Sequence, residues 1–368
     1  LRERLAAGPV TVGLTGVPLS PYRYDLLLTE PDRIPADLRY TTGELALATV
    51  ESEFHQHGSE MRALDARAGY PDGVGVAFDF NRSVTVAHRR TDHVSTRGVL
   101  WRAQATAEGE NLGGTQGTVY GPLRAYRPGE RAREVWFPAL TRPAVPQTTP
   151  DYAYGTPVNR WHDTIRVAVP QYADGAGTTY GWIDGRSDRA RLTLRRGDRV
   201  VGTTTGSSHQ FTVGNGNGTY HLTLDVTRDT FPERVWWTTS TATSTTWTFR
   251  SKRPRGDEPQ VLPLPQLRYD LRTDLSNVVR ADRPYPLTLT PGYQPGASGR
   301  GRFQVTVWVS YDDGAHWRPA PVRGTGTVTA TVPAAPPGAA FATVRVTAAD
   351  RDGNRIDQTI TRAWKVRP

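Results

Sequence analysis

The clearest pattern in the chain is an alternation of apolar and polar residues between Arg302 and Trp317. Successive side chains of a β-strand point to opposite faces, so β-branched and aromatic residues at every second position indicate a half-buried strand. Here the apolar face would be formed by Phe303, Val305, Val307, Val309 and Tyr311. Asp313-Gly314 follows, and this dipeptide suits a hairpin turn because it tolerates positive φ.

The turn also fits the pattern Ser-x-Asp-x-Gly-x-x-Trp, through Ser310, Asp312, Gly314 and Trp317. This resembles an Asp-box, a hairpin whose Ser and Asp side chains bond to turn backbone while the Trp packs beneath. Propeller proteins that use the box carry several copies, and this chain has one. We therefore interpret these residues as structural.

Similar short alternating segments recur along the chain, for example Gly73 to Ala87, Tyr220 to Val226 and Phe341 to Ala348. The 36 Gly and 29 Pro residues supply frequent turns. Residues 41–54 fit either a strand or a helix, and we favour a strand because the surroundings are β. The sequence thus predicts an all-β fold of tandem β-sandwich domains, Ig-like or fibronectin-like, with little helix.

Two irregular segments suggest domain boundaries. Residues 141–159 carry four prolines, and Ser251 to Pro265 is first charged and then proline-rich. We expect a β-rich unit over residues 1–150, in which residues 1–38 resemble the tail of a preceding unit. An Ig-like β-sandwich would follow over 151–256, and a C-terminal β-sandwich with the Asp-box hairpin over 257–368. The second boundary should be extended and accessible to proteases.

Composition narrows the function classes. The 368 residues include no Cys, which excludes disulfides and thiolate metal sites, and a single Met, which suits an extracellular protein. No apolar stretch reaches the roughly 18 residues that span a membrane. The net charge is +9, but Arg and acidic residues are interspersed, so we expect no nucleic-acid binding. The chain starts at Leu1 without a signal-peptide pattern, as expected for a piece of a longer or processed polypeptide.

Candidate catalytic chemistry is sparse. A nucleophilic triad needs a Ser on a strained turn, but Gly-x-Ser-x-Gly does not occur, and Ser207-Ser208-His209 lies in a Thr- and Gly-rich loop. His55-Gln56-His57 would place two imidazoles on one face of an extended segment, yet no third metal ligand is signalled nearby. We expect that segment to be an exposed strand end, and we assign no catalytic residue.

The best metal candidate is Asp350, Asp352 and Asn354, with Gly353 in the turn. Oxygen ligands on alternate residues suit Ca²⁺, although the run is too short for an EF-hand loop. The alternative is a hairpin whose Asp and Asn side chains cap backbone amides.

Adjacent Trp236 and Trp237 suggest a sugar-binding aromatic platform. Neighbouring residues of a strand point to opposite faces, so at most one of the two can lie in the core. The other would either bind a polymer or cover a neighbouring domain.

Several segments, in order, carry a family resemblance: RARLTLRRGDRVVG, YHLTLDVTR, TTWTFRSKRP, LRYDLRTDLSNVVRADRPYPLTLTP, VTVWVSYDDGAHWRP and ATVRVTAADRDGNRIDQTITRAWKVRP. Together they resemble the C-terminal region of large secreted subtilisin-like serine peptidases of actinobacteria, the S8 family. In that family the catalytic domain precedes this region, and its His-Gly-Thr and Gly-Thr-Ser-Met signatures have no match here.

The resemblance implies a secreted, non-catalytic accessory region that stabilises the peptidase or binds substrate or cell wall. Its partners would be the catalytic domain of the same polypeptide and a protein substrate or wall polymer. The alternative is an independent carbohydrate- or cell-wall-binding β-sandwich protein. A third hypothesis is that the chain is an enzyme whose active site cannot be recognised from the sequence, or a released inhibitor-like product.

Overall fold

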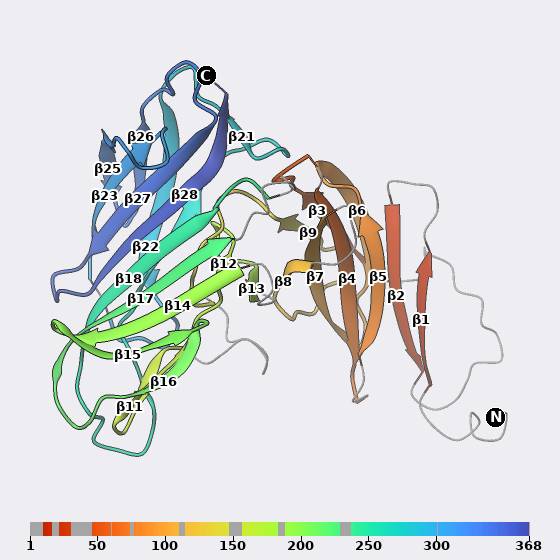
Figure 1. Cartoon of the computed structure of the whole chain (residues 1–368). Coiled ribbons are helices and arrows are strands. Elements are labelled where there is room, and N and C mark those ends of the chain that lie inside the picture. The colour runs from red at the N-terminus through yellow and green to blue at the C-terminus, as the bar shows by residue number, and fades with distance from the viewer. Residues whose placement is uncertain are drawn as a thin grey trace.

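The computed structural model describes residues 10–16, 22–30, 46–59, 61–73, 77–109, 115–146, 157–182, 188–228, 237–299 and 301–367. Every regular element in these ranges is a β-strand. The all-β prediction is confirmed: β-sandwiches follow one another in tandem, with the N-terminal strands on one side and the remaining strands on the other (Figure 1). No helix in the described ranges is long and apolar enough to cross a membrane.

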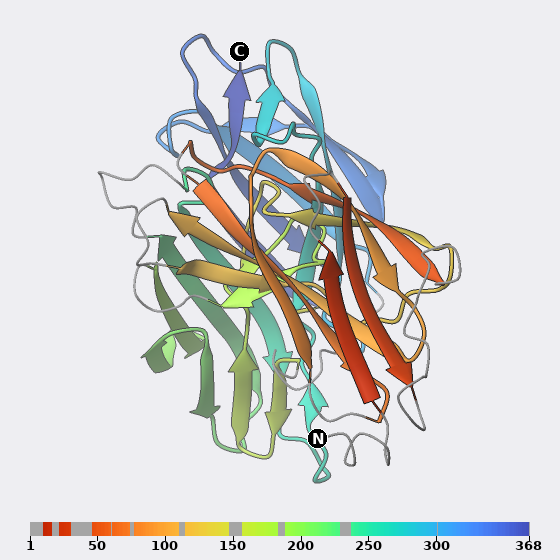
Figure 2. The ribbon, with the colours of Figure 1, turned by 90° about the vertical axis from the view of Figure 1, so that its right-hand side faces the viewer.

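The N-terminal sandwich consists of two sheets that pack face to face, with its strands nearest the viewer in Figure 2. Sheet A has the order β1 (Val10–Gly16), β2 (Tyr22–Glu30), β6 (His88–Ser95), β3 (Leu47–Phe54) and β9 (Arg131–Trp136). Sheet B has the order β12 (Tyr172–Ala173), β13 (Tyr180–Trp182), β8 (Thr115–Tyr120), β7 (Val99–Gly109), β4 (Met61–Pro71) and β5 (Phe78–Val84). The ambiguous residues 41–54 therefore supply a strand, β3, from Leu47 onward.

The rest of the chain is organised on one nine-stranded sheet, sheet D. Its order is β15 (Arg199–Thr205), β14 (Asp188–Arg196), β17 (Gly218–Arg228), β18 (Ala242–Ser251), β28 (Arg355–Arg367), β27 (Phe341–Ala349), β23 (Gln304–Ser310) and β24 (Arg318–Ala320), with β21 (Val278–Arg280) beside β28.

Two smaller sheets complete this part of the molecule. Sheet C has the order β16 (Ser208–Thr212), β11 (Thr164–Ala168), β10 (Asn159–Trp161) and β19 (Gln260–Val261). Sheet E has the order β20 (Pro265–Asp270), β22 (Tyr285–Tyr293), β26 (Thr327–Val332) and β25 (Val322–Thr325).

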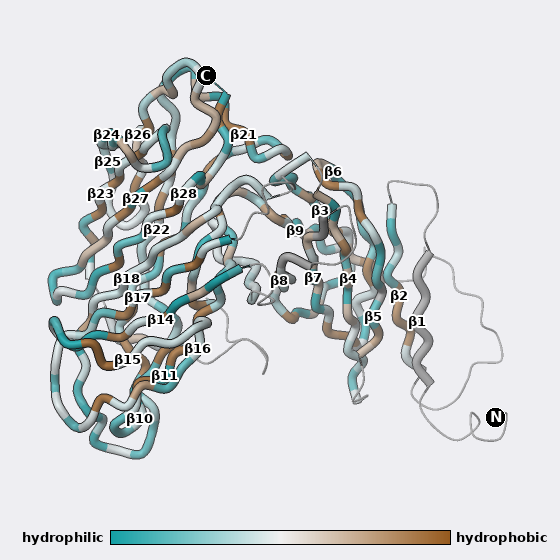
Figure 3. The backbone as a smooth tube through the Cα atoms, viewed as in Figure 1, coloured by the Kyte–Doolittle hydropathy of each residue, from teal (hydrophilic) through white to brown (hydrophobic). Residues whose placement is uncertain are grey.

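The alternation in the sequence explains which faces are buried. In β23, Val305, Val307 and Val309 lie in the core, as their spacing predicts. Apolar and polar residues alternate along the strands of sheet D in Figure 3. One large apolar cluster contains core residues of sheets B, C, D and E, so the two halves of the molecule share packing.

Strand pairing crosses both predicted domain boundaries. Strands β12 and β13 extend sheet B of the N-terminal sandwich, although they follow residue 150. Strand β18 pairs with β28 from Ala242↔Thr361 to Thr248↔Arg355. The limits at 150 and 256 stay predictions, but the strands on either side of them belong to common sheets.

The expectation for the second boundary is wrong in its proline-rich half. Leu262 and Leu264 are 2% and 0% exposed. The amide of Gln294 holds this segment, since its Nε2 donates to the carbonyl oxygens of Val158 at 2.8 Å and Leu262 at 2.6 Å. Only the charged half before Gln260 is largely exposed, because burial of the leucines and pairing of β19 with β10 fix the remainder.

Candidate functional site: a cleft at an open strand edge

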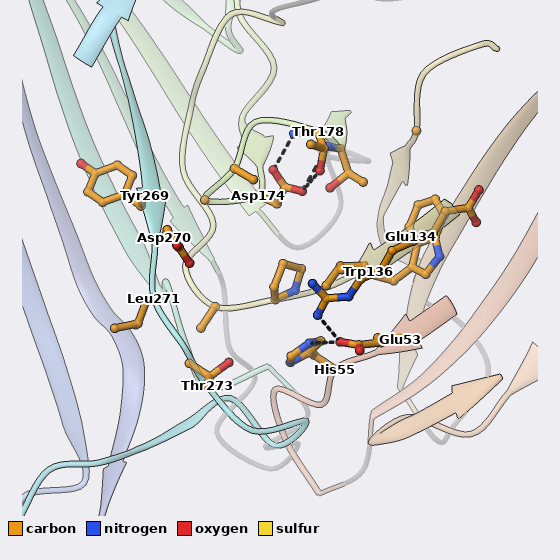
Figure 4. A pocket seen from close by; sticks show the side chains of 18 of the residues that line it. Glu53, His55, Glu134, Trp136, Asp174, Thr178, Tyr269, Asp270, Leu271 and Thr273 are labelled. Atoms are coloured by element: carbon orange, nitrogen blue, oxygen red, sulfur yellow. Dashed lines mark hydrogen bonds and ion pairs between the residues drawn. The ribbon is translucent and has the colours of Figure 1, made fainter. Parts of the chain in front are cut away.

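A cleft of about 860 Å³ lies at the edge of sheet A, which faces the turn between β12 and β13 of sheet B and one segment of the other half of the molecule. On one side it is lined by the ends of β3 and β9, and on the other by the turn of residues 174–179 and the segment of residues 269–275. Figure 4 shows Glu53, His55, Glu134 and Trp136 on the first side, and Asp174, Tyr269 and Asp270 on the second. This volume is within the range of roughly 300–1,000 Å³ that is usual for ligand pockets.

Charged side chains form a row on the outer face of sheet A at the cleft. The carboxylate of Glu53 accepts hydrogen bonds from Arg89 Nε at 3.1 Å and from Arg133 Nη2 at 2.7 Å. The arginine side chains are 70% and 61% exposed, whereas that of Glu53 is 10% exposed. Burial raises the pKa of Glu53, but Arg133 and Arg89 outweigh burial, so the pKa is lowered and the carboxylate stays charged.

His55 lies behind this row, with its Nε2 3.8 Å from a carboxylate oxygen of Glu53. Its pKa is lowered because burial disfavours the imidazolium, and Glu53 acts in the opposite direction. A neutral imidazole beside a carboxylate could accept a proton. Within the described ranges, however, no serine hydroxyl hydrogen bonds to a histidine, so the geometry offers no support for a nucleophilic triad there.

The backbone of β9 is the second feature of the cleft. Strand β9 is the last strand of sheet A and pairs only with β3, in parallel register, among the described strands. Thr49 N donates to Glu130 O and His55 N donates to Trp136 O, which fixes the register at both ends. In a parallel pair alternate residues face the partner. The N–H and C=O groups of Arg131, Arg133 and Val135 therefore face away from β3, along the open edge.

The opposite wall is held by specific bonds. The carboxylate of Asp174 accepts the N–H of Thr178 at 2.7 Å and that of Thr179 at 3.2 Å, which closes the turn. Tyr269 N then donates to Gly175 O at 2.8 Å and ties the turn to β20. A Cβ at Gly175 would lie 2.9 Å from the carbonyl oxygen of Tyr269, so glycine permits this approach.

An ionic layer between sheets A and B supports β9 from behind. Glu134 of β9 accepts a hydrogen bond from Arg67 at 2.6 Å, and Arg67 also contacts Asp25 at 2.9 Å and Asp92 at 3.3 Å. The network continues through two further arginines: Arg23 contacts Asp25 and Asp65, and Arg90 contacts Asp65 and Asp92. Except for Glu134, every side chain in it is at most 9% exposed.

This layer was not predicted from the sequence, although a signal for it exists. Opposite charges two residues apart occur at Arg23 and Asp25 in β2, at Asp65 and Arg67 in β4, and at Arg90 and Asp92 in β6. Residues two apart in a strand share a face. The pattern is equally compatible with a solvated face, and only the packing of sheet A on sheet B buries it.

The two histidines of His55-Gln56-His57 correct another prediction. The segment is not an exposed strand end, because His55 and His57 are 5% and 0% exposed. His57 Nδ1 hydrogen bonds with the hydroxyl of Thr239. Its ring stacks on Trp237 with 3.7 Å between ring centroids. Burial in the junction between the two halves lowers the pKa of His57 well below its usual value.

Of the predicted aromatic pair, Trp237 is the one that lies in the core. It is 5% exposed, packs edge-on against Phe137 and has the guanidinium of Arg228 3.8 Å from its ring centroid. It offers no free face to a sugar and instead covers the junction with the N-terminal sandwich. Trp236 lies outside the described residues, so a sugar-binding role stays a prediction for Trp236 and no longer includes Trp237.

At the predicted calcium site, the structure shows the capping arrangement. Asp350 Oδ1 accepts the N–H groups of Asp352 and Asn354, each at 2.8 Å, and Oδ2 accepts Asn354 Nδ2 at 2.8 Å and the hydroxyl of Tyr293. In the described part of the chain, no three His, Asp or Glu side chains are grouped to hold a metal ion. Calcium binding here stays a prediction.

The Asp-box residues have the expected hydrogen bonds. The hydroxyl of Ser310 accepts the N–H of Gly314 at 2.9 Å and donates to Asp312 Oδ1 at 2.6 Å, and Asp312 Oδ1 accepts the N–H of His316 at 2.9 Å. Gly314 has φ +100°, and a Cβ there would lie 3.4 Å from the ring of Trp317. The motif thus stabilises the hairpin between β23 and β24.

The Ser/His cluster in the sequence is not assembled into a site. Ser207 is buried, while Ser208 and His209 are exposed, and the His209 ring contacts Phe211.

Comparisons with known proteins add little about function. A scan against protein-family models finds no match, and neither does a search of curated proteins. Among solved structures, the chain is similar to one described as "Crystal structure of Dpr2 Ig1-Ig2 in complex with DIP-Theta Ig1-Ig3". That match is 12% identical, covers 85% of this chain and 98% of the other, and has a TM-score of 0.16. At this TM-score the likeness carries no argument about function.

Proposed function

We propose that this chain is the non-catalytic accessory region of a secreted subtilisin-like serine endopeptidase and that it holds polypeptide substrate in the cleft beside β9. The observation that carries the proposal is the edge of β9, with which no described strand pairs, within a cleft of about 860 Å³. An exposed strand edge is a template for an extended polypeptide, which is also the conformation in which peptidases take their substrates. The enzyme class in this proposal comes from the sequence, because its segments resemble the S8 family in the same order.

The geometry also favours binding over stabilisation alone. Arg89 and Arg133 present charge at the cleft, and their side chains remain 70% and 61% exposed, so a charged ligand can reach both. The opposite wall is fixed by Asp174 and Gly175, so the cleft is preformed. A preformed site loses less conformational entropy when it binds a ligand.

The test begins with the native protein, captured from culture medium by an antibody against this chain. We expect an intact mass well above the 40.6 kDa of the chain. A fluorophosphonate should label a serine in the captured species that lies outside residues 1–368, and the isolated chain should remain unlabelled. A free native species of 40.6 kDa, or labelling of a serine within the chain, would refute the proposal. An insoluble-polysaccharide pull-down of the same sample tests the wall-binding alternative.

A further inference from the structure

We infer that the cleft binds its polypeptide as an added strand on β9, and that it selects segments in which acidic and apolar residues alternate. This inference deepens the proposed function, on which it rests for the nature of the ligand, but the binding itself is a property of this chain. Three groups of observations carry it: the backbone of β9, the charges on the outer face of sheet A, and the lining of the inner side, where the charges are already paired.

The backbone provides the affinity. Arg131, Arg133 and Val135 each direct one N–H and one C=O away from β3, and no described strand pairs with that edge. Strands in a sheet lie about 4.8 Å apart, so a strand placed beside β9 would occupy the cleft that Arg133, Val135 and Trp136 line. An extended peptide gains ladder hydrogen bonds there, whereas a compact ligand would leave the edge groups to water.

The outer face of sheet A sets the charge of the ligand. Arg89 of β6 lies directly opposite Glu53 of β3 in the register, and Arg133 of β9 reaches Glu53 from the other side. The row therefore alternates between positive, negative and positive charge across three strands. A strand added beyond β9 would place its side chain next to Arg133, and opposite charges on neighbouring strands stabilise the pair. The ligand side chain next to Arg133 should therefore be Asp or Glu.

The exposure of the two arginines agrees with that assignment. Two guanidinium groups converge on Glu53, and both arginine side chains remain more than half exposed. Glu51 lies opposite Arg133 in the register and is exposed, but no hydrogen bond joins the two side chains, so Arg133 can pair with a carboxylate of the ligand. A basic side chain at the same place would instead meet Arg133 and be repelled.

The inner side of the cleft combines apolar groups with charges that are already paired. Ala103, Pro122 and Trp136 line it together with Glu134 and Arg124, whose partners are Arg67 and Glu130. An uncharged side chain therefore suits this side. In an added strand, the residues on either side of the acidic one would point to this side. The ligand is therefore a segment in which acidic residues on one face alternate with Val-like residues on the other.

The probe is an eight-residue peptide of alternating Val and Glu, labelled for fluorescence anisotropy, with a Val and Lys peptide as its matched control. We expect the Glu peptide to bind the full chain and the Lys peptide to bind at least about tenfold more weakly, because the row then repels it. Arg133→Glu should weaken binding of the Glu peptide about tenfold and strengthen binding of the Lys peptide. Equal binding of both peptides by the wild type would overturn the charge assignment.

The strand geometry has its own test. Two versions of the Glu peptide carry N-methyl groups, one on every Val and the other on every Glu. Alternate residues face β9, so one version should bind like the parent and the other should lose binding. Val135→Pro, which removes an outward N–H, should weaken binding, while Val135→Ala, which keeps that N–H, should not. If Val135→Pro fails to fold, the two N-methylated peptides still test whether the ligand binds as an added strand. Equal binding of the two versions would overturn the inference.

Other occupants of the edge give different results. A second copy of the chain would appear in sedimentation as a dimer that Arg133→Glu or Val135→Pro dissociates, and that result would overturn the inference. These measurements need no peptidase. Peptide binding without an attached peptidase would therefore refute the accessory role in a peptidase and leave this inference intact. An attached peptidase without binding of the Glu peptide would refute this inference and leave the accessory role intact.

Discussion

The side-chain oxygen of Asn277 accepts a hydrogen bond from the backbone N–H of Ala139 at 2.7 Å, although 138 residues separate the two. The amide nitrogen of the same side chain donates to Phe137 O at 3.1 Å and to Gln56 O at 3.3 Å. Asn277 is fully buried and has φ +60°. One residue thus joins the end of β3, the segment after β9 and the start of β21, and helps to fix the wall of the cleft.

Replacing Asn277 should destabilise the fold. Asn277→Ala removes the partner of three backbone groups, two of which, at Ala139 and Phe137, are buried. Each unsatisfied buried group costs about 1–3 kcal/mol, so we expect a loss of roughly 2 kcal/mol or more in the free energy of unfolding. Asn277→Gly is the matched control, since it accepts the positive φ without a Cβ and should be about 1 kcal/mol less destabilised than Asn277→Ala. Urea denaturation measures both values. A stability of Asn277→Ala equal to that of the wild type would show that these bonds contribute nothing.

The ionic layer should be sensitive to the loss of one partner. Arg67→Met leaves Asp25, Asp92 and Glu134 without their shared cation, and removing one partner from a buried pair costs about 3–5 kcal/mol. Arg133→Met removes an exposed arginine from a comparable pair with Glu53 and should cost at most about 1 kcal/mol. Thermal unfolding followed by circular dichroism compares the two. Similar losses for both variants would contradict the buried character of the network.

Acid should weaken the same layer. Burial raises the pKa of Asp92, but Arg67, Arg90 and Arg23 outweigh burial and lower it from 3.8 to about 2. A carboxylate whose pKa is lower in the folded state stabilises the fold above its unfolded pKa, and this contribution disappears as pH falls through the folded pKa. The free energy of unfolding should therefore decrease between about pH 4 and pH 2. In Asp92→Asn this part of the decrease should be absent, and an unchanged pH profile would contradict the assignment.

The Asp-box serine should stabilise its hairpin locally. Ser310→Ala leaves the N–H of Gly314 without its acceptor, and we expect a loss of about 1–2 kcal/mol in the free energy of unfolding. Ser310→Thr retains the hydroxyl and serves as the control for loss of the hydrogen bond. Binding of the Glu peptide should stay unchanged in Ser310→Ala, because the hairpin does not line the cleft. An altered affinity for the Glu peptide would show that the Asp-box also contributes to binding.

Local features of this protein could be read from the sequence. The period-two alternation located β23, and Asp313-Gly314 adopts the positive φ that the turn after it requires. The Asp-box hydrogen bonds and the cap at Asp350 also followed from residues within a few positions of one another. Each of these features depends on backbone preferences and contacts that are short in sequence, so a single stretch contains all the information needed.

The cleft depended on contacts that no stretch contains. Alternation assigns a residue to a face but does not name the neighbouring strand, so the pairing of β3 with β9, and the open edge beyond it, came only with the fold. The same holds for His57, which was expected to be exposed and instead lies under Trp237, 180 residues later. The sequence by itself determined the strands and their turns. Tertiary packing decided which charges are buried, which edge stays open and what lies across from it, because those outcomes depend on surfaces that meet only after the chain has folded.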